Sequence, residues 1–146
     1  MKLRKRIGLL ALLIVLFLAG YWTGHLHNKE AFREIRIGYQ NADNPNRIDY
    51  KMVFTDTENQ SIVDNFLMIY IHKEKVGNVN IDVDNPDIYF EMGSPKQSVR
   101  LINSRMWFTE DGAVIGERKG ENWDQVEYFR IDKSDADYMK EKIDYQ

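Results

Sequence analysis

Cysteine is absent from this chain of 146 residues, and its absence excludes several kinds of chemistry. The protein forms no disulfide bond, carries no lipid on a cysteine, has no thiol nucleophile and offers no sulfur ligand to a metal. A folded domain in this chain is therefore held together by its core and its hydrogen bonds. Residues 35–146 are numerous enough to form one such domain without covalent cross-links.

Motifs of the common enzyme classes are also missing. The 9 glycines form neither a P-loop nor a dinucleotide-binding pattern, and no G-x-S-x-G sequence is present. His72 is the one histidine after residue 34, and it falls at the end of a predicted helix. Acidic pairs occur at Glu110/Asp111 and Asp135/Asp137, where a turn and a helix start explain them better than a glycosidase site. We therefore expect no catalytic residues, no cofactor and no enzymatic activity.

An excess of basic residues is lacking as well. The net charge is −3, and it becomes −7 once the four cations among residues 2–6 are set aside, leaving 16 basic against 23 acidic side chains. Surfaces that bind nucleic acid need clustered Lys and Arg to neutralise phosphates. The acidic remainder of the chain lacks that property, so we expect no nucleic acid among its partners.

The apolar stretch Ile7–Gly24, which contains no charged residue, is the strongest positive signal in the sequence. As a helix it would extend about 27 Å, close to the roughly 30 Å hydrocarbon core of a bilayer. The cations among residues 2–6 favour a cytoplasmic N-terminus, and Tyr21 and Trp22 suit the membrane–water boundary at the other end. The sequence therefore predicts a signal anchor over residues 1–24, which spans the lipid bilayer of the cell membrane once.

A cleaved signal peptide is the alternative interpretation of the same stretch. Its basic start and apolar centre fit, but no A-x-A-like pair of small residues follows the apolar run. Ala19 and Gly20 are instead followed by two bulky aromatic residues. Both interpretations place the rest of the chain outside the membrane, either tethered or secreted. In the tethered form, residues 25–34 are a polar stalk and residues 35–146 an extracytoplasmic domain.

The first half of the predicted domain combines a hairpin and a helix. Residues 35–39 and 48–55 alternate in polarity on either side of the turn-forming residues 41–46, which indicates a β-hairpin. Helical spacing of apolar residues then covers Thr57–Lys73. Asp56 or Thr57 is available to cap this helix by accepting a hydrogen bond from a free backbone N–H.

The second half is predicted to consist of strands and a closing helix. The strands are expected over residues 87–93, 98–102, 105–109, 113–117 and 123–131. Ser134 opens a last helix over Asp135–Ile143, with Asp137 as its partner in a capping box. The predicted fold class is therefore α+β, in which an N-terminal transmembrane helix is followed by a mostly antiparallel β-sheet with two helices packed on it.

Three aspartates are candidates for a metal site. Asp82, Asp84 and Asp87 lie close together with Asn85, and carboxylate and amide oxygens are the ligands that Ca²⁺ prefers. The stretch lacks the central glycine and the bidentate glutamate of a calcium-binding loop. An exposed polar connection is therefore the simpler interpretation of the same residues.

Aromatic side chains gather on the late strands, at Trp107, Phe108, Trp123, Tyr128 and Phe129. Trp and Tyr are frequent where proteins bind partners, because their rings combine a large apolar surface with a polar group. Packing in the core of a small sheet is the favoured interpretation, and a binding surface is the alternative.

Four segments carry a resemblance that covers residues 48–143: F-T-D at 54–56, N-P-D-I-Y-F-E at 85–91, W-F-T-E-D-G at 107–112 and R-I-D-K-S-D-A-D-Y-M-K-E-K-I at 130–143. The chain resembles small extracytoplasmic domains of Bacillus-type Gram-positive bacteria, which are carried on a signal anchor or a lipoprotein leader. The lipid-bearing cysteine of some of those proteins is missing here. The resemblance implies a location at the membrane and no particular activity.

The leading hypothesis is a binding or regulatory module at the outer face of the membrane. Its partner would be another membrane protein or a cell-wall protein that docks on a sheet face or a strand edge. The alternative is an envelope-acting hydrolase that uses acidic residues. An enzyme requires a cleft with converging titratable groups, whereas a binding module requires an exposed apolar or aromatic patch.

The predicted orientation can be tested by proteolysis of spheroplasts. External protease should remove a C-terminal tag and digest residues 35–146, because cations at the N-terminus hold that end in the cytoplasm. An N-terminal tag should survive until the membrane is permeabilised. A C-terminal domain that is digested only after permeabilisation would contradict the orientation.

Overall fold

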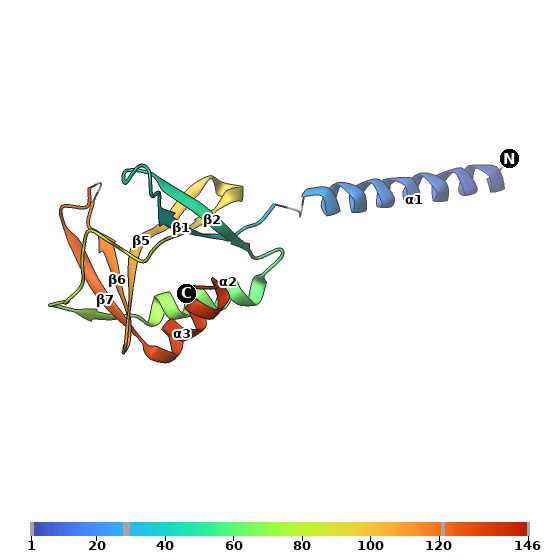
Figure 1. Cartoon of the computed structure of the whole chain (residues 1–146). Coiled ribbons are helices and arrows are strands. Elements are labelled where there is room, and N and C mark those ends of the chain that lie inside the picture. Colours follow the sequence, from blue (N-terminus) through green and yellow to red (C-terminus); the bar gives the residue numbers. More distant parts are fainter. Residues whose placement is uncertain (1, 28–29, 121, 146) are drawn as a thin grey trace. The chain divides into compact units, whose positions relative to one another are not determined.

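The computed structural model describes residues 2–27, 30–120 and 122–145. The chain separates into two compact units, the first ending at Glu30 and the second beginning at Ala31. Figure 1 shows the elements of both units along the chain. Of the stalk predicted over residues 25–34, residues 25–27 belong to the first unit's helix, and residues 28 and 29 lie outside the described part.

The first unit is the helix α1, Lys2–His27. Its uncharged window Ile7–Gly24 has a mean hydropathy of 2.1, and none of it is buried in the structure. The Thr23 hydroxyl lies 2.8 Å from the carbonyl oxygen of Ala19 and 3.0 Å from that of Gly20, so this polar group is satisfied within the helix. By length and composition, α1 is able to cross a membrane.

The second unit contains a seven-stranded sheet in which every adjacent pair is antiparallel. The strand order is β2-β1-β4-β5-β6-β7-β3. The strands are β1 (Glu34–Gln40), β2 (Ile48–Thr55), β3 (Glu74–Val76), β4 (Ile88–Ser94), β5 (Val99–Thr109), β6 (Gly112–Arg118) and β7 (Val126–Asp132). The predicted α+β fold and the hairpin of β1 and β2 are confirmed.

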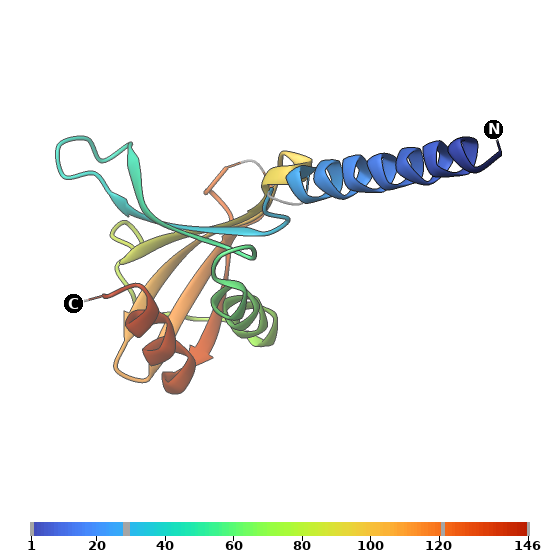
Figure 2. The same ribbon diagram turned by 90° about the vertical axis from the view of Figure 1, so that its right-hand side faces the viewer.

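Two helices, α2 (Gln60–His72) and α3 (Lys133–Lys142), pack on one side of this sheet, which we call the helix face. Figure 2 shows both helices on the same side of the strands. Phe66 of α2 is fully buried, and its ring lies 5.8 Å from that of Phe54, 6.3 Å from Phe90 and 6.0 Å from Tyr138. Because α3 adds the buried Met139, one core joins both helices to the strands.

The start of α2 differs from the prediction. The helix begins at Gln60, its N-cap residue is Asn59, and no side chain caps it. Asp56 does not cap the helix because its carboxylate binds backbone groups elsewhere. Helix-capping preference is local, and here a partner from a distant part of the chain prevails.

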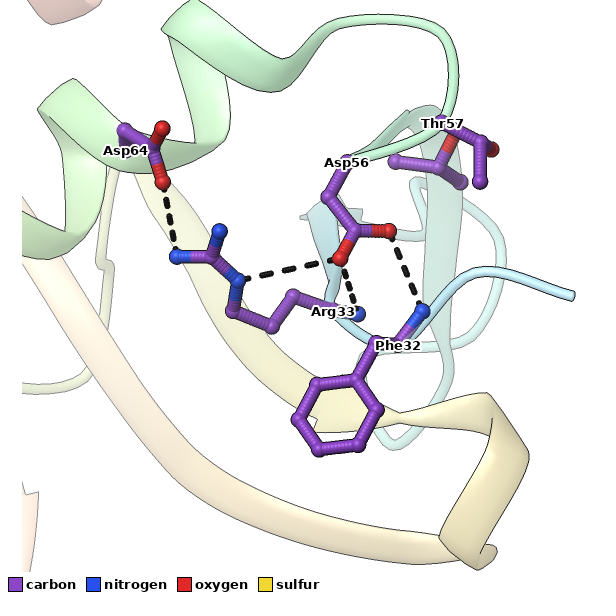
Figure 3. A network of polar contacts seen from close by, with 6 residues as sticks. Phe32, Arg33, Asp56, Thr57 and Asp64 are labelled. Atoms are coloured by element: carbon purple, nitrogen blue, oxygen red, sulfur yellow. Dashed lines mark hydrogen bonds and ion pairs between the residues drawn. The ribbon is translucent and has the colours of Figure 1, made fainter. Parts of the chain in front are cut away.

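Asp56 joins the entrance of the domain to the segment before α2, as Figure 3 shows. One carboxylate oxygen accepts a hydrogen bond of 3.1 Å from the N–H of Phe32, and the other accepts one of 3.1 Å from the N–H of Arg33. The backbone N–H of Asp56 donates back to the carbonyl of Arg33. The Arg33 guanidinium extends to Asp64 on α2 at 2.7 Å. These contacts hold the first residues of the domain against α2.

The strands differ from the prediction at two places. Residues 74–76, for which no strand was predicted, form β3, which pairs with β7. Three residues are too few to show a period of two, so this strand left no signal. The two segments predicted at 98–102 and 105–109 are one strand, β5, which continues through the buried Ser104. The short helix η1, Pro95–Gln97, joins β4 to β5.

The cap of α3 is Asp132 rather than Ser134. The Asp132 carboxylate accepts hydrogen bonds of 2.9 Å from the N–H of Asp135 and 3.0 Å from the Ser134 hydroxyl. These bonds lower the pKa of Asp132 below its usual value, and the hydrogen bond from the Asp135 N–H is the larger cause. Asp137 is not part of a capping box, and its carboxylate lies 3.5 Å from the Lys133 ammonium.

The role of Asp56 predicts a difference between two carboxylates that contact the same arginine. Asp56→Ala should lower the free energy of unfolding by about 2–3 kcal/mol, because two backbone N–H groups lose a charged acceptor. Asp64→Ala is the matched control and should cost about 1 kcal/mol or less, because it removes only a half-exposed ion pair. Urea unfolding of the full chain in detergent micelles, followed by tryptophan fluorescence, measures both. Equal losses would contradict the assigned role.

Candidate functional site

The side of the sheet opposite to the helices, which we call the outer face, carries a row of aromatic and basic side chains. Tyr89 on β4 is paired with Arg105 on β5, Arg105 with Gly116 on β6, and Gly116 with Tyr128 on β7. Side chains alternate between the two faces of a strand, so Trp107 shares this face with Arg105. The row therefore runs across four adjacent strands, β4, β5, β6 and β7.

The structure divides the five late aromatic residues that the sequence singled out. Phe108 and Phe129 pack against the core on the helix face, as core packing predicts. Trp107, Trp123 and Tyr128 instead line a cavity of about 350 Å³ on the outer face. We call this space the outer-face cavity, and its other lining residues are Val83, Asp84, Arg105, Asp124 and Val126.

Trp107 forms a rigid wall of the outer-face cavity. Trp107 has a relative exposure of only 5%, and its indole N–H donates a hydrogen bond of 2.7 Å to the carbonyl of Asp82. The ring lies across Gly116, where a Cβ atom would stand 3.0 Å from it. The Tyr128 ring centroid is 6.2 Å away at a tilt of 59°. A glycine on β6 therefore lets a large ring lie close to the sheet.

Arg105 supplies a cation without a matching anion. Its guanidinium lies 4.1 Å from the ring centroid of Trp123 and 5.8 Å from that of Tyr89. Its Nε atom is buried and has no hydrogen-bond partner among the residues that the structure describes. Within residues 30–120 and 122–145, no carboxylate lies within 4.0 Å of it. A guanidinium held in one plane by a ring, with unmatched N–H donors beside a cavity, is suited to bind an anionic group.

The three metal candidates do not meet at one point. The Asp82 carboxylate accepts hydrogen bonds from the Asn85 amide at 2.6 Å and the Asp84 N–H at 3.3 Å. The Asp87 carboxylate accepts one of 2.6 Å from the N–H of Phe108 and one of 2.6 Å from the Tyr145 hydroxyl. Burial and the bond to Asp87 raise the pKa of Tyr145 to about 12. In the described ranges, no group of three or more His, Asp or Glu is placed to hold a metal ion.

A polar cluster on the helix face is closed on itself. The Tyr70 hydroxyl donates to Glu117, and the Lys73 ammonium lies 3.0 Å from the same carboxylate oxygen of Glu117. Lys73 also donates to the Tyr70 carbonyl at 3.1 Å and lies 4.0 Å from the Tyr70 ring centroid. Burial, followed by the bond to Glu117, raises the pKa of Tyr70. Since its charges are paired, the cluster fastens the end of α2 to β6.

The buried acid Glu91 also has partners. Arg100 lies 3.3 Å from it, and the Asn103 amide donates a hydrogen bond of 3.1 Å to it. Burial and the nearby Glu91 raise the pKa of Tyr50. The adjoining cavity of about 220 Å³ includes the buried Ser94 hydroxyl, which has no partner, but both its arginines are paired with acids. The outer-face cavity is therefore the stronger candidate site.

The acidic pairs and the histidine lie away from the outer-face cavity. Glu110 and Asp111 form the exposed turn between β5 and β6, and Asp135 and Asp137 belong to the start of α3. His72 is the exposed last residue of α2. The sequence did not single out Arg105 or Asp124. The signal that was available was the alternation of Arg105 and Trp107 with the apolar Met106 and Phe108, which places arginine and tryptophan on one face.

Comparison with known proteins gave no relative: no family model matches the chain, and no curated protein and no solved structure matches it. The resemblance to extracytoplasmic domains of Gram-positive bacteria therefore stays a prediction. What the chain does has to be inferred from its own residues.

The close contact at Gly116 predicts how the cavity responds to one added methyl group. Gly116→Ala should destabilise the chain by about 1–3 kcal/mol, because the new Cβ forces Trp107 or Val126 to move. The fluorescence of the displaced indole should change with it. Gly77→Ala is the matched control, since nothing lies within 4 Å of a Cβ there. Its free energy of unfolding should stay within about 0.5 kcal/mol of that of the unaltered chain. A Gly116→Ala variant as stable as the control would contradict this packing.

Proposed function

We propose that this chain is a single-pass membrane protein whose extracytoplasmic domain is a binding or regulatory module. Two observations support the membrane part: α1 is long and apolar enough to span a bilayer, and cations precede its apolar window. The N-terminus is cytoplasmic and the domain lies outside in this proposal. The Ile7–Gly24 window is the part in contact with lipid.

The binding part of the proposal rests on one observation, the unmatched guanidinium of Arg105 beside the outer-face cavity. Leaving a buried donor unpaired costs the protein about 1–3 kcal/mol. Proteins commonly accept such a cost where a ligand supplies the missing partner. The surrounding rings of Trp107, Trp123 and Tyr128 add the apolar and aromatic surface that binding sites use. The proposed partner is another membrane protein or a cell-wall protein, bound through contacts that depend on Arg105.

A second candidate function, an envelope-acting hydrolase, is favoured by one feature of the same cavity. Asp84 and Asp124 both line it, and hydrolysis of a glycosidic bond requires two carboxylates that face each other across the substrate. Turnover of an envelope polymer that is lost in Asp84→Asn and in Asp124→Asn would support the hydrolase over the binding module.

Site-specific photo-crosslinking in intact membranes tests the binding module. A photoreactive amino acid replaces the exposed Asn122, next to Trp123, in the full chain. It should give a reproducible crosslinked product, and Arg105→Ala should reduce that product about tenfold or more, as expected for a central anchor residue. The matched control places the same group at the exposed Asn46, in the turn between β1 and β2.

Two results would overturn the proposal for this cavity. One is the same crosslinked product from position 46 as from position 122. The other is a yield at position 122 that does not change in the Arg105→Ala variant. A melting temperature of that variant within a few degrees of the unaltered chain shows that the loss comes from binding and not from unfolding.

A further inference from the structure

The outer-face cavity brings together a partly buried cation and two exposed carboxylates that have no partner among the described residues. Arg105 supplies one positive charge, and Asp84 and Asp124 supply two negative charges. Among the described residues, neither carboxylate accepts a hydrogen bond or forms an ion pair, and neither lies within 4.0 Å of the Arg105 guanidinium. The cavity therefore separates opposite charges that could have neutralised each other.

A carboxylate is the group that best matches Arg105. The guanidinium is planar and presents its N–H donors as a fork, which pairs with the two oxygens of a carboxylate. Stacking on Trp123 at 4.1 Å holds that plane in place. A phosphate fits the same fork, but its larger negative charge would also face Asp84 and Asp124, which would repel it.

An ammonium group is the matching partner for the two aspartates. It has three N–H donors and one positive charge, and two carboxylates offer it acceptors on more than one side. A metal ion fits less well, because the described residues hold no group of three suitable ligands here. An uncharged sugar would leave the buried Nε of Arg105 without an anion, and it would not use the two exposed carboxylates.

The remaining walls fit an apolar side chain. Trp107, Tyr128, Val83 and Val126 line the space between the charged groups. The volume of about 350 Å³ is at the lower end of the range of roughly 300–1,000 Å³ that is typical of small-molecule pockets. It therefore suits a small ligand with one apolar substituent.

We propose that the outer-face cavity binds a ligand that carries a carboxylate and an ammonium group on one short framework, namely a free α-amino acid or a short peptide with an apolar side chain. Arg105 binds the carboxylate, Asp84 and Asp124 bind the ammonium group, and the aromatic walls enclose the side chain. This ligand class rests on the proposed function as a binding module. It adds the chemistry of what is bound.

Titration calorimetry on the full chain in detergent micelles tests this ligand class. The probes are leucine, methionine and phenylalanine, together with the dipeptide alanyl-phenylalanine, which separates a free amino acid from a peptide as the source. At least one probe should bind. Its N-acetylated form lacks the ammonium group and its amide form lacks the carboxylate, so each should bind about tenfold to a hundredfold more weakly.

Variants assign the charges to residues. Arg105→Gln should weaken binding of the free acid and leave the acid and amide forms with similar affinities. Asp84→Asn combined with Asp124→Asn should remove the preference for a free ammonium group in the same way. Asp111→Asn, an exposed carboxylate in the turn between β5 and β6, is the matched control and should bind like the unaltered chain.

Three outcomes would overturn the ligand class: no binding by any probe, equal binding by the blocked and unblocked forms, or an affinity that Arg105→Gln leaves unchanged. These outcomes are distinguishable from a failure of the proposed function. If crosslinking at position 122 still depends on Arg105 while no probe binds, the ligand class is wrong and the binding module stands. If a probe binds as expected but the crosslinking yield at position 122 does not depend on Arg105, the cavity binds a small ligand and the proposal of a protein partner is wrong.

Discussion

The strands β4 and β6 are buried on both faces, yet the described helices of this domain cover only one face of its sheet. α2 and α3 bury the helix face around Phe66 and Met139. On the outer face, the connection before β4 passes over Trp107, whose indole is fixed to the carbonyl of Asp82, and Trp123 covers Arg105. The outer-face cavity is what this partial cover leaves open.

The same constraint explains why Arg105 is placed among rings. A cation in the middle of a sheet loses part of its hydration, and ring faces replace some of it without neutralising the charge. Two other buried or partly buried charges of the domain are paired, Lys73 with Glu117 and Glu91 with Arg100. Arg105 differs from these examples because its Nε atom is buried and unpartnered. Departures of this kind concentrate at functional sites, which is why the proposals centre on this residue.

Much of the fold could be predicted from residues close together in the chain. The alternation over 48–55 gave the bounds of β2, because a strand with one buried face repeats every two residues. Errors arose where distant residues intervened or where an element was short. Asp56 suits a helix cap, but Phe32 and Arg33 occupy its carboxylate. β3 is three residues long and shows no period. In the site, tryptophan and tyrosine were recognisable candidates, whereas a single arginine in a strand resembles any exposed residue.

The sequence by itself determined the apolar window Ile7–Gly24, the α+β class and the acidic character of the domain, because hydropathy, periodicity and charge are properties of neighbouring residues. Only the tertiary structure decided which of five aromatic residues enter the core and which line a cavity. It also brought Asp84, Arg105 and Asp124 to one cavity from three separate segments. Strand register and the path of the covering loops make that arrangement, and both depend on contacts between residues far apart in the chain.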